Sequence, residues 1–212
     1  MSFQIGIIPV TAFQQNCALV WDDETKQGAV IDPGGDVPVS MSQINKLGLS
    51  ITDIFLTHGH IDHAGGAAEL AERLGVRITG PGVEDEFLLD GLQEQGRAYG
   101  ISARNCTPDV WLKAGDTIRL GGQEFEVRHC PGHTPGHMVF LNRLMNFGIV
   151  GDVLFRGSIG RTDFGDYGDH EQLIASIERE LLVLPDEFSF LCGHGPGSTI
   201  GAERQGNPFL QG

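Results

Sequence analysis

Short apolar runs alternate along the chain with stretches in which apolar residues recur at helical spacing. The runs predict strands at 3–8, 16–21, 28–31, 54–56, 76–79, 117–120, 125–129, 138–141, 147–150 and 188–191. The helical spacing predicts helices at 37–47, 67–74, 83–95 and 170–182. Pro9 is expected to end the first strand. Because no linker, charge run or repeat divides this alternation, the pattern favours one α/β domain over residues 1–212.

The composition is that of a folded protein with an acidic surface. Hydrophobic residues make up 40% of the 212 residues and charged residues 20%, which argues against a disordered chain. The formal net charge is −14, from 14 basic and 28 acidic residues. Nucleic acids and anionic membranes bind basic patches, so neither is an expected partner.

The sequence also bears on compartment. Residues 1–6 lack the positive region and the continuous apolar region of a secretory signal, and no apolar run approaches the roughly 20 residues that span a bilayer. The four cysteines are scattered and form no C-x-x-C pair, so reduced thiols are the simplest interpretation. We therefore expect a cytoplasmic protein that does not bind membranes. The oligomeric state is left open.

Glycine is the outlier of the composition, with 31 residues against an average usage of roughly 7%. The glycines have no period and gather beside histidines at 59–66, 132–136 and 193–197. Glycine allows sharp turns and close approach of the backbone to a neighbouring group. This placement indicates several loops packed around one site.

The densest chemical motif is an H-x-H-x-D-H run between a predicted strand and a predicted helix. In an extended segment alternate side chains point the same way, so His58, His60 and Asp62 are expected on one side and His63 on another. Four ligand types in six residues exceed what one tetrahedral ion easily uses, which points to two ions. Asp62 has a second possible role as the N-cap of the following helix.

Three more candidate ligands, His133, Asp152 and His194, each follow a strand-like run. Ends of strands and the loops after them are where sites gather. Any one of these alone would be read as a surface or capping residue. His129 and His137 flank the His133 motif and are expected either to support it or to lie on the surface. Cys130 is expected to be a buried thiol without a catalytic role.

Taken together, the motifs resemble those of the metallo-β-lactamase superfamily over essentially the whole chain. The motifs are DPGG at 32–35, H-x-H-x-D-H at 58–63, PGH at 131–133, GD at 151–152 and GHG at 193–195. The resemblance implies a four-layer αβ/βα sandwich with the metal site at one edge. It also implies ligand roles. His58, His60 and His133 would hold one ion, and Asp62, His63 and His194 the other. Asp152 would bridge the two ions, and Asp32 would brace the ligand loop without binding metal.

Within the superfamily the chain is similar to the glyoxalase II branch, the hydroxyacylglutathione hydrolases, in their short bacterial form. The additional matches are at 9–13, 16–17, 130–137, 151–155, 160–164 and 207–210. Long members of that branch carry a C-terminal helical domain that helps to hold glutathione. Only about eighteen residues follow His194, so that domain is not expected here, and its glutathione contacts cannot be carried over.

The implied activity is hydrolysis of a glutathione thioester such as S-lactoylglutathione, a step in methylglyoxal detoxification. Two divalent ions would share a hydroxide that attacks the thioester carbonyl, and Asp62 would orient this nucleophile as the catalytic carboxylate. Zinc is favoured, with iron and manganese as alternatives, because imidazole and carboxylate suit all three. Asp152 stands where many lactam-cleaving relatives have cysteine, which argues against a β-lactamase.

Substrate contacts are less well marked by the sequence. A glutathione thioester carries carboxylates, so Arg156 and Arg161 are candidate partners after the Asp152 strand, and Tyr167 could supply a hydroxyl. Three other functions stay open: a mononuclear iron persulfide dioxygenase and a lactonase, which resemble the same superfamily, and a metal-binding module without catalysis.

Overall fold

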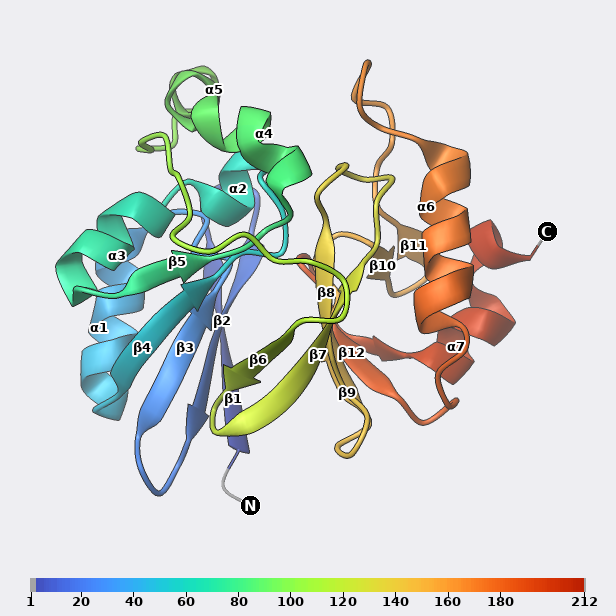
Figure 1. The fold of residues 1–212 in the computed structure, drawn as a ribbon, viewed down its shortest axis with the longest axis horizontal. Helices are drawn as coiled ribbons and strands as arrows, with labels where there is room; N and C mark the ends of the chain where they lie inside the picture. Colours follow the sequence, from blue (N-terminus) through green and yellow to red (C-terminus); the bar gives the residue numbers. More distant parts are fainter. Residues whose placement is uncertain (1–2, 212) are drawn as a thin grey trace.

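The computed structural model describes residues 3–211, which build two facing β-sheets with helices outside each (Figure 1). The first sheet has the order β1-β2-β3-β4-β5. Its strands are β1 (Phe3–Val10), β2 (Gln15–Asp22), β3 (Gln27–Ile31), β4 (Ser50–Phe55) and β5 (Arg77–Thr79). The strands β3, β4 and β5 run parallel, and α1 (Val37–Leu47) and α3 (Ala67–Leu74) connect them on the outer face.

The second sheet has the order β13-β12-β9-β8-β7-β6. Its strands are β6 (Thr117–Leu120), β7 (Gln123–His129), β8 (Met138–Asn142), β9 (Phe147–Ile149), β12 (Ser189–Leu191) and β13 (Ser198–Thr199). α6 (His170–Ser176), its π-helical continuation Ile177–Leu181 and α7 (Ile200–Gly206) cover the outer face (Figure 1).

The remaining elements are short and lie mostly near one edge of the sandwich. They are α2 (Ile61–Ala64), the 3-10 turn Val83–Asp85, α4 (Glu86–Asp90), α5 (Leu92–Tyr99), the hairpin of β10 (Leu154–Phe155) and β11 (Ser158–Ile159), and the 3-10 turn Pro208–Leu210. No helix in the described part of the chain is long and apolar enough to cross a membrane.

Three apolar cores correspond to the three interfaces of a four-layer sandwich. One, with Leu19 and Ile54, lies between the first sheet and its helices, and one, with Leu141 and Leu173, lies between the second sheet and its helices. The third joins the inner faces of both sheets, where Phe55 meets Phe140 with ring centroids 6.2 Å apart. The αβ/βα sandwich implied by the sequence is therefore confirmed.

Several predicted elements differ from the structure for local reasons. β1 continues through Pro9, because β1 is an edge strand and Pro9 needs no backbone donor on its open side. The helix predicted over 83–95 is broken into three pieces, with Gly91 between α4 and α5. The helix over 170–182 changes to π-helical pitch after Ser176. Asp62 is not an N-cap: it lies in the first turn of α2, whose N-cap position is His60.

The strand directions bring the motifs to one edge. β4 of the first sheet and β9 and β12 of the second end there, each three residues before a candidate ligand: His58, Asp152 and His194 respectively. The connection from β7 to β8 carries His133 to the same edge. The fold thus gathers segments from both halves of the chain at the mouth of the sandwich.

Candidate metal centre

The ligand loop after β4 is held by very close backbone packing. His60 is extended, with φ −66° and ψ 151°, and α2 then turns Asp62 and His63 in different directions. The turn at Gly34 lies against this loop so closely that a Cβ there would be 1.4 Å from the Asp62 carbonyl oxygen. Only glycine fits at that contact, which explains one of the glycines that the sequence places in the DPGG turn.

Six of the seven predicted ligands lie together in two groups of three. His58, His60 and His133 offer ligand atoms within 4.8 Å of one another. The ligand atoms of a second group lie equally close, and this group consists of Asp62, His63 and His194. These are the two sets that the sequence resemblance implies, and their role as metal ligands stays a prediction.

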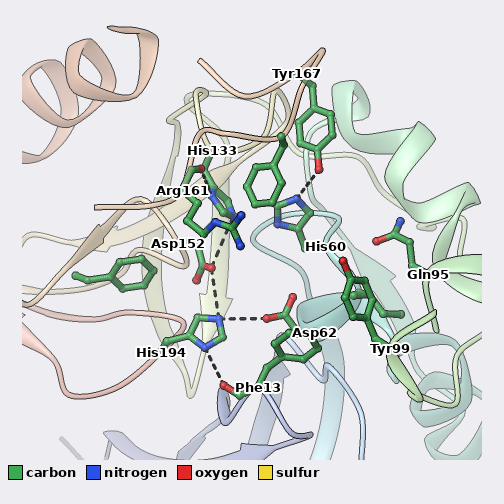
Figure 2. A pocket seen from close by; sticks show the side chains of 13 residues that line it. Phe13, His60, Asp62, Gln95, Tyr99, His133, Asp152, Arg161, Tyr167 and His194 are labelled. Carbon is green, nitrogen blue, oxygen red and sulfur yellow. Dashed lines mark hydrogen bonds and ion pairs between the residues drawn. The ribbon is translucent and has the colours of Figure 1, made fainter. Parts of the chain in front are cut away.

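Asp152 lies between the two groups (Figure 2). Its Oδ1 is 3.4 Å from His63 Nε2, and its Oδ2 is 3.4 Å from His194 Nε2. Oδ2 is also 3.6 Å from Nε2 of His133, which belongs to the other group. One carboxylate therefore faces both groups, as a bridging ligand must.

Asp32 holds the inner histidines from behind. Its carboxylate accepts hydrogen bonds from the backbone N–H of Thr57 at 2.7 Å and from the Thr57 hydroxyl at 2.7 Å. Its Oδ2 also lies 3.0 Å from His63 Nδ1, which leaves His63 Nε2 directed at the centre. Thr57 Oγ1 lies 3.1 Å from His58 Nδ1 in the same way. Asp32 thus orients the His63 ring and, through Thr57, the His58 ring. An oxygen of its carboxylate also lies within 4.8 Å of ligand atoms of both histidines, and its role as a brace and not a ligand stays a prediction.

The outer nitrogen of each remaining histidine also has a partner. The pairs are His60 Nε2 with the Tyr167 hydroxyl at 3.0 Å, His133 Nδ1 with the Arg161 carbonyl at 2.7 Å, and His194 Nδ1 with the Phe13 carbonyl at 3.3 Å. Partners of this kind fix the tautomer and orientation of metal-binding imidazoles. All five rings are therefore held with one nitrogen toward the common space.

Some buried polar atoms of the site have no hydrogen-bond partner among the protein groups. Eight buried side-chain polar atoms in residues 3–211 have no hydrogen-bond partner. Three of them are His63 Nε2, His133 Nε2 and Asp152 Oδ1, and the other five lie outside the ligand set. Buried polar groups are otherwise paired almost without exception. All three atoms belong to the two groups or to the carboxylate between them. Divalent metal ions would satisfy all three, so the residues present fit a metal centre.

The charges of the site are arranged for cations. Burial alone would raise the pKa of Asp152, but His63 and His194 beside it hold the pKa well below its ordinary range. Burial lowers the pKa of His58, and it lowers that of His60 to about 3. His63 and His194 differ: although burial acts in the opposite direction, Asp152 and Asp62 raise the pKa of His63, and they raise that of His194 to about 9. Because metal binds the neutral imidazole, these two rings would release a proton on binding, whereas His58 and His60 are already neutral.

The centre forms the floor of a cavity of about 380 Å³ (Figure 2). Its walls are mainly aromatic and come from four segments: Phe13, Tyr99, Phe155, Phe164 and Tyr167. Arg161 is the only lysine or arginine among the lining residues. It makes two hydrogen bonds to Asp163, at 2.9 and 3.0 Å, and lies over the Phe164 ring.

Two of the three predicted substrate contacts line this pocket. Arg161 and Tyr167 line it, and Arg156 does not. Phe155 of β10 lines the pocket, and the next residue, Arg156, is exposed in the turn between β10 and β11. The lining therefore includes two of the three predicted substrate contacts, and all three stay predictions.

Two residues beside the His133 motif have clear places. His137 is fully buried, stacks on His58 with ring centroids 4.6 Å apart, and accepts a hydrogen bond from the Asp152 backbone N–H at 3.1 Å. It supports the centre and is not a surface residue. Cys130 is buried, and burial raises the pKa of its thiol, so it is no ready nucleophile.

Sequence reasoning missed part of the pocket wall. Gln95 and Tyr99 come from α5, in a region whose weak pattern gave no hint of a site. Phe13 lies in a motif matched to the glyoxalase II branch, and that match was the available signal. Thr57 precedes the histidine motif, but nothing in the sequence marks its hydroxyl as a support for His58.

Comparisons with known proteins agree with this geometry. The family model described as "Metallo-beta-lactamase superfamily" matches residues 10–194. A relative from Haemophilus influenzae named "Hydroxyacylglutathione hydrolase GloC" is 48% identical, and the match covers 97% of each chain.

Two solved structures are similar over nearly their full length. "BLEG-1 B3 metallo-beta-lactamase" is 33% identical with a TM-score of 0.89, covering 99% of this chain and 100% of the other. "TTHA1623 in a di-iron-bound form" is 36% identical with a TM-score of 0.84, covering 97% and 100%. With two His/Asp groups at the edge of an αβ/βα sandwich, the chain belongs to the metallo-beta-lactamase superfamily and is a metal-dependent hydrolase.

Proposed function

We propose that the protein is a binuclear thioester hydrolase that cleaves a hydroxyacylglutathione such as S-lactoylglutathione into the hydroxy acid and glutathione. The observation that carries the proposal is Asp152, which faces two complete three-residue groups at the floor of one pocket. The 48% identical relative, named as a hydroxyacylglutathione hydrolase, supports the substrate class.

Each group has the residues to hold one ion, with Asp152 shared between them. When bound, two divalent ions supply hydroxide at neutral pH and positive charge that polarises a carbonyl oxygen. Zinc, iron and manganese all suit these ligands. The di-iron form of one similar structure is a property of that protein and leaves the metal here to be measured.

The chain's own residues bind and orient the substrate. Asp62 Oδ2 lies 3.2 Å from His194 Nε2 and its side chain is partly open to the pocket, so it can direct a nucleophile toward the space above the floor. The aromatic walls offer apolar contacts to the thioester. Arg161 offers the pocket's fixed positive charge to a glutathione carboxylate, in competition with Asp163.

A thiolate leaving group fits a site with few proton donors. Burial raises the pKa of Tyr167 to about 12, and its hydroxyl is hydrogen-bonded to His60. A thiolate departs without a strong general acid because its conjugate acid has a pKa near 8.5, whereas an amine leaving group needs a proton. This favours thioester over lactam cleavage.

The test is a substrate panel at fixed concentration of zinc-loaded and iron-loaded protein. The panel contains S-lactoylglutathione, a β-lactam, a homoserine lactone and glutathione persulfide, the last with an oxygen electrode. We expect the thioester to have the highest kcat/KM, no oxygen uptake, and two metal ions per chain by elemental analysis. Oxygen uptake with persulfide and negligible thioester cleavage would replace the proposal with a persulfide dioxygenase, and a plateau at one ion would refute the binuclear site.

A further inference from the structure

A buried carboxylate outside the metal centre joins the two loops that carry His58, His60 and His133. Asp85 ends the 3-10 turn before α4, and its side chain is fully buried. The side chains and amides that bond to it are all neutral. An ionised carboxylate without a cation is costly to bury unless several donors satisfy it. Burial raises the pKa of Asp85 to about 6, although its hydrogen bonds act in the opposite direction.

The donors to Asp85 come from both ligand loops. Its Oδ2 accepts the backbone N–H of Gly59, the residue between His58 and His60, at 2.8 Å. The same oxygen accepts the hydroxyl of Thr134, the residue after His133, at 2.8 Å. Its Oδ1 accepts the backbone N–H of Gly136 at 2.6 Å. A single carboxylate therefore links the loop after β4 to the loop between β7 and β8.

The two glycines explain how the carboxylate comes so close. A Cβ on Gly136 would lie 2.8 Å from Asp85 Cγ and 2.7 Å from its backbone nitrogen. A Cβ on Gly59 would lie 3.3 Å from Asp85 Cβ and 2.8 Å from Leu88 Cβ. Neither loop would keep its distance to Asp85 with a larger residue. The loops are built to approach this side chain.

We propose that Asp85 is a positioning residue that fixes the distance between the His58–His60 loop and the His133 loop, and so sets the geometry of that ligand group. The inference rests on the proposed metal centre. The other group, Asp62, His63 and His194, is held elsewhere, because Asp32 orients His63 and the Phe13 carbonyl orients His194. A change at Asp85 should therefore act on one of the two ions.

The test compares Asp85→Asn with a matched control, Glu203→Gln. Asparagine keeps the shape of Asp85 but turns an NH₂ group toward a donor, so at least one of the three bonds is lost. Glu203 is also a buried carboxylate, with donors Gly157 N–H, Ser198 hydroxyl and Asn207 amide, none of which lies in the loop of His58 and His60 or in the loop of His133. Its variant controls for the general cost of neutralising a buried carboxylate.

Two measurements are made. Competition with a chromophoric chelator gives the affinity of each zinc ion, and NMR of the histidine ring nitrogens assigns the affected site. Amide hydrogen exchange of Gly59 and Gly136 is followed in metal-free protein. For Asp85→Asn we expect the ion at His58, His60 and His133 to bind about 10–100-fold more weakly, the range for residues that support ligands, with the other ion within about threefold. Exchange at the two glycines should accelerate at least about tenfold, as expected when a bond that protects an amide is lost.

The outcomes separate clearly. A folded Asp85→Asn protein that binds both ions as wild type does, or loses both equally, overturns the proposal, as does the same selective loss in Glu203→Gln. If Asp85→Asn does not fold, Thr134→Val removes one donor only. It should weaken the same ion several-fold, and an unchanged affinity would count against the role of Asp85. Wild-type protein that binds two zinc ions but cleaves no thioester refutes the proposed function and leaves this test intact.

Discussion

Replacing Gly193 with alanine should damage the metal centre by a predictable amount. A Cβ at this position would lie 2.0 Å from Asp152 Oδ1 and 2.6 Å from His63 Cε1. Contacts of a Cβ below about 3 Å are not tolerated in close-packed interiors, so the Asp152 oxygen must retreat by about 1 Å. A misplacement of about 1 Å in a reacting group can cost about 100-fold in rate, or roughly 2.7 kcal/mol. We therefore expect kcat/KM for S-lactoylglutathione to fall about 100-fold in Gly193→Ala.

The assay pairs thioester hydrolysis with zinc content and the thermal unfolding of metal-free protein. Gly206→Ala is the control, because a Cβ at Gly206 meets no atom within 4 Å. The control should keep full activity. Overpacking costs about 1–3 kcal/mol, so Gly193→Ala should still fold. Two bound zinc ions together with kcat/KM within threefold of wild type would refute the idea that the position of the Asp152 carboxylate governs the reaction.

Three further predictions concern charge and mechanism. Burial alone would lower the pKa of His194, but hydrogen bonds to Asp152 and Asp62 raise it to about 9. The protonated ring therefore stabilises the metal-free fold fully below pH 6.5, and this contribution is lost as the pH rises through 9. The Tm of chelator-treated protein should accordingly fall between pH 6.5 and 9, and a flat or rising profile would contradict that coupling. Arg161→Ala should raise KM for the glutathione thioester several-fold with little change in kcat. Asp163→Asn, which frees the guanidinium of Arg161, should lower KM. If steady-state kinetics show both variants to match wild type, Arg161 is not a substrate contact. Cys130→Ser should retain full kcat, since the thiol is buried and its pKa is raised, and a folded, fully metallated but inactive variant would require a thiol nucleophile.

The elements that sequence predicts best are those with a local stop signal. α1 and α3 end where expected because Gly48 and Gly75 adopt the left-handed conformation that closes a helix. The prediction that Pro9 ends the first strand was wrong because the effect of proline depends on whether the strand lies at a sheet edge, which is a property of the whole sheet. Similarly, the pitch change after Ser176 has no marker in the amphipathic pattern of 170–182.

The same contrast holds for the candidate site. The seven proposed ligands could be identified because they sit in short motifs with distinctive spacing, and the structure brings them together. Asp85 could not be identified, because its partners are backbone amides and a hydroxyl that only the fold brings near it. That Arg156 lies outside the pocket lining could not be predicted either, because it sits in the turn after β10 and the sequence does not fix which way a turn residue points.

The placement of the two ligand groups has a consequence for how the halves of the molecule stay together. His58 and His60 belong to the half of the chain that contains the first sheet, and His133 to the half that contains the second. An ion bound by all three would therefore cross-link the two halves at the edge of the sandwich. The connection between the halves passes through exposed residues around Arg104 and Asn105, where a protease can reach it. After cleavage there, the two fragments would be held together by the apolar interface between the sheets and by the metal cross-link. Because a ligand that binds only the assembled state stabilises it by mass action, chelation should loosen the two fragments and added zinc should rejoin them.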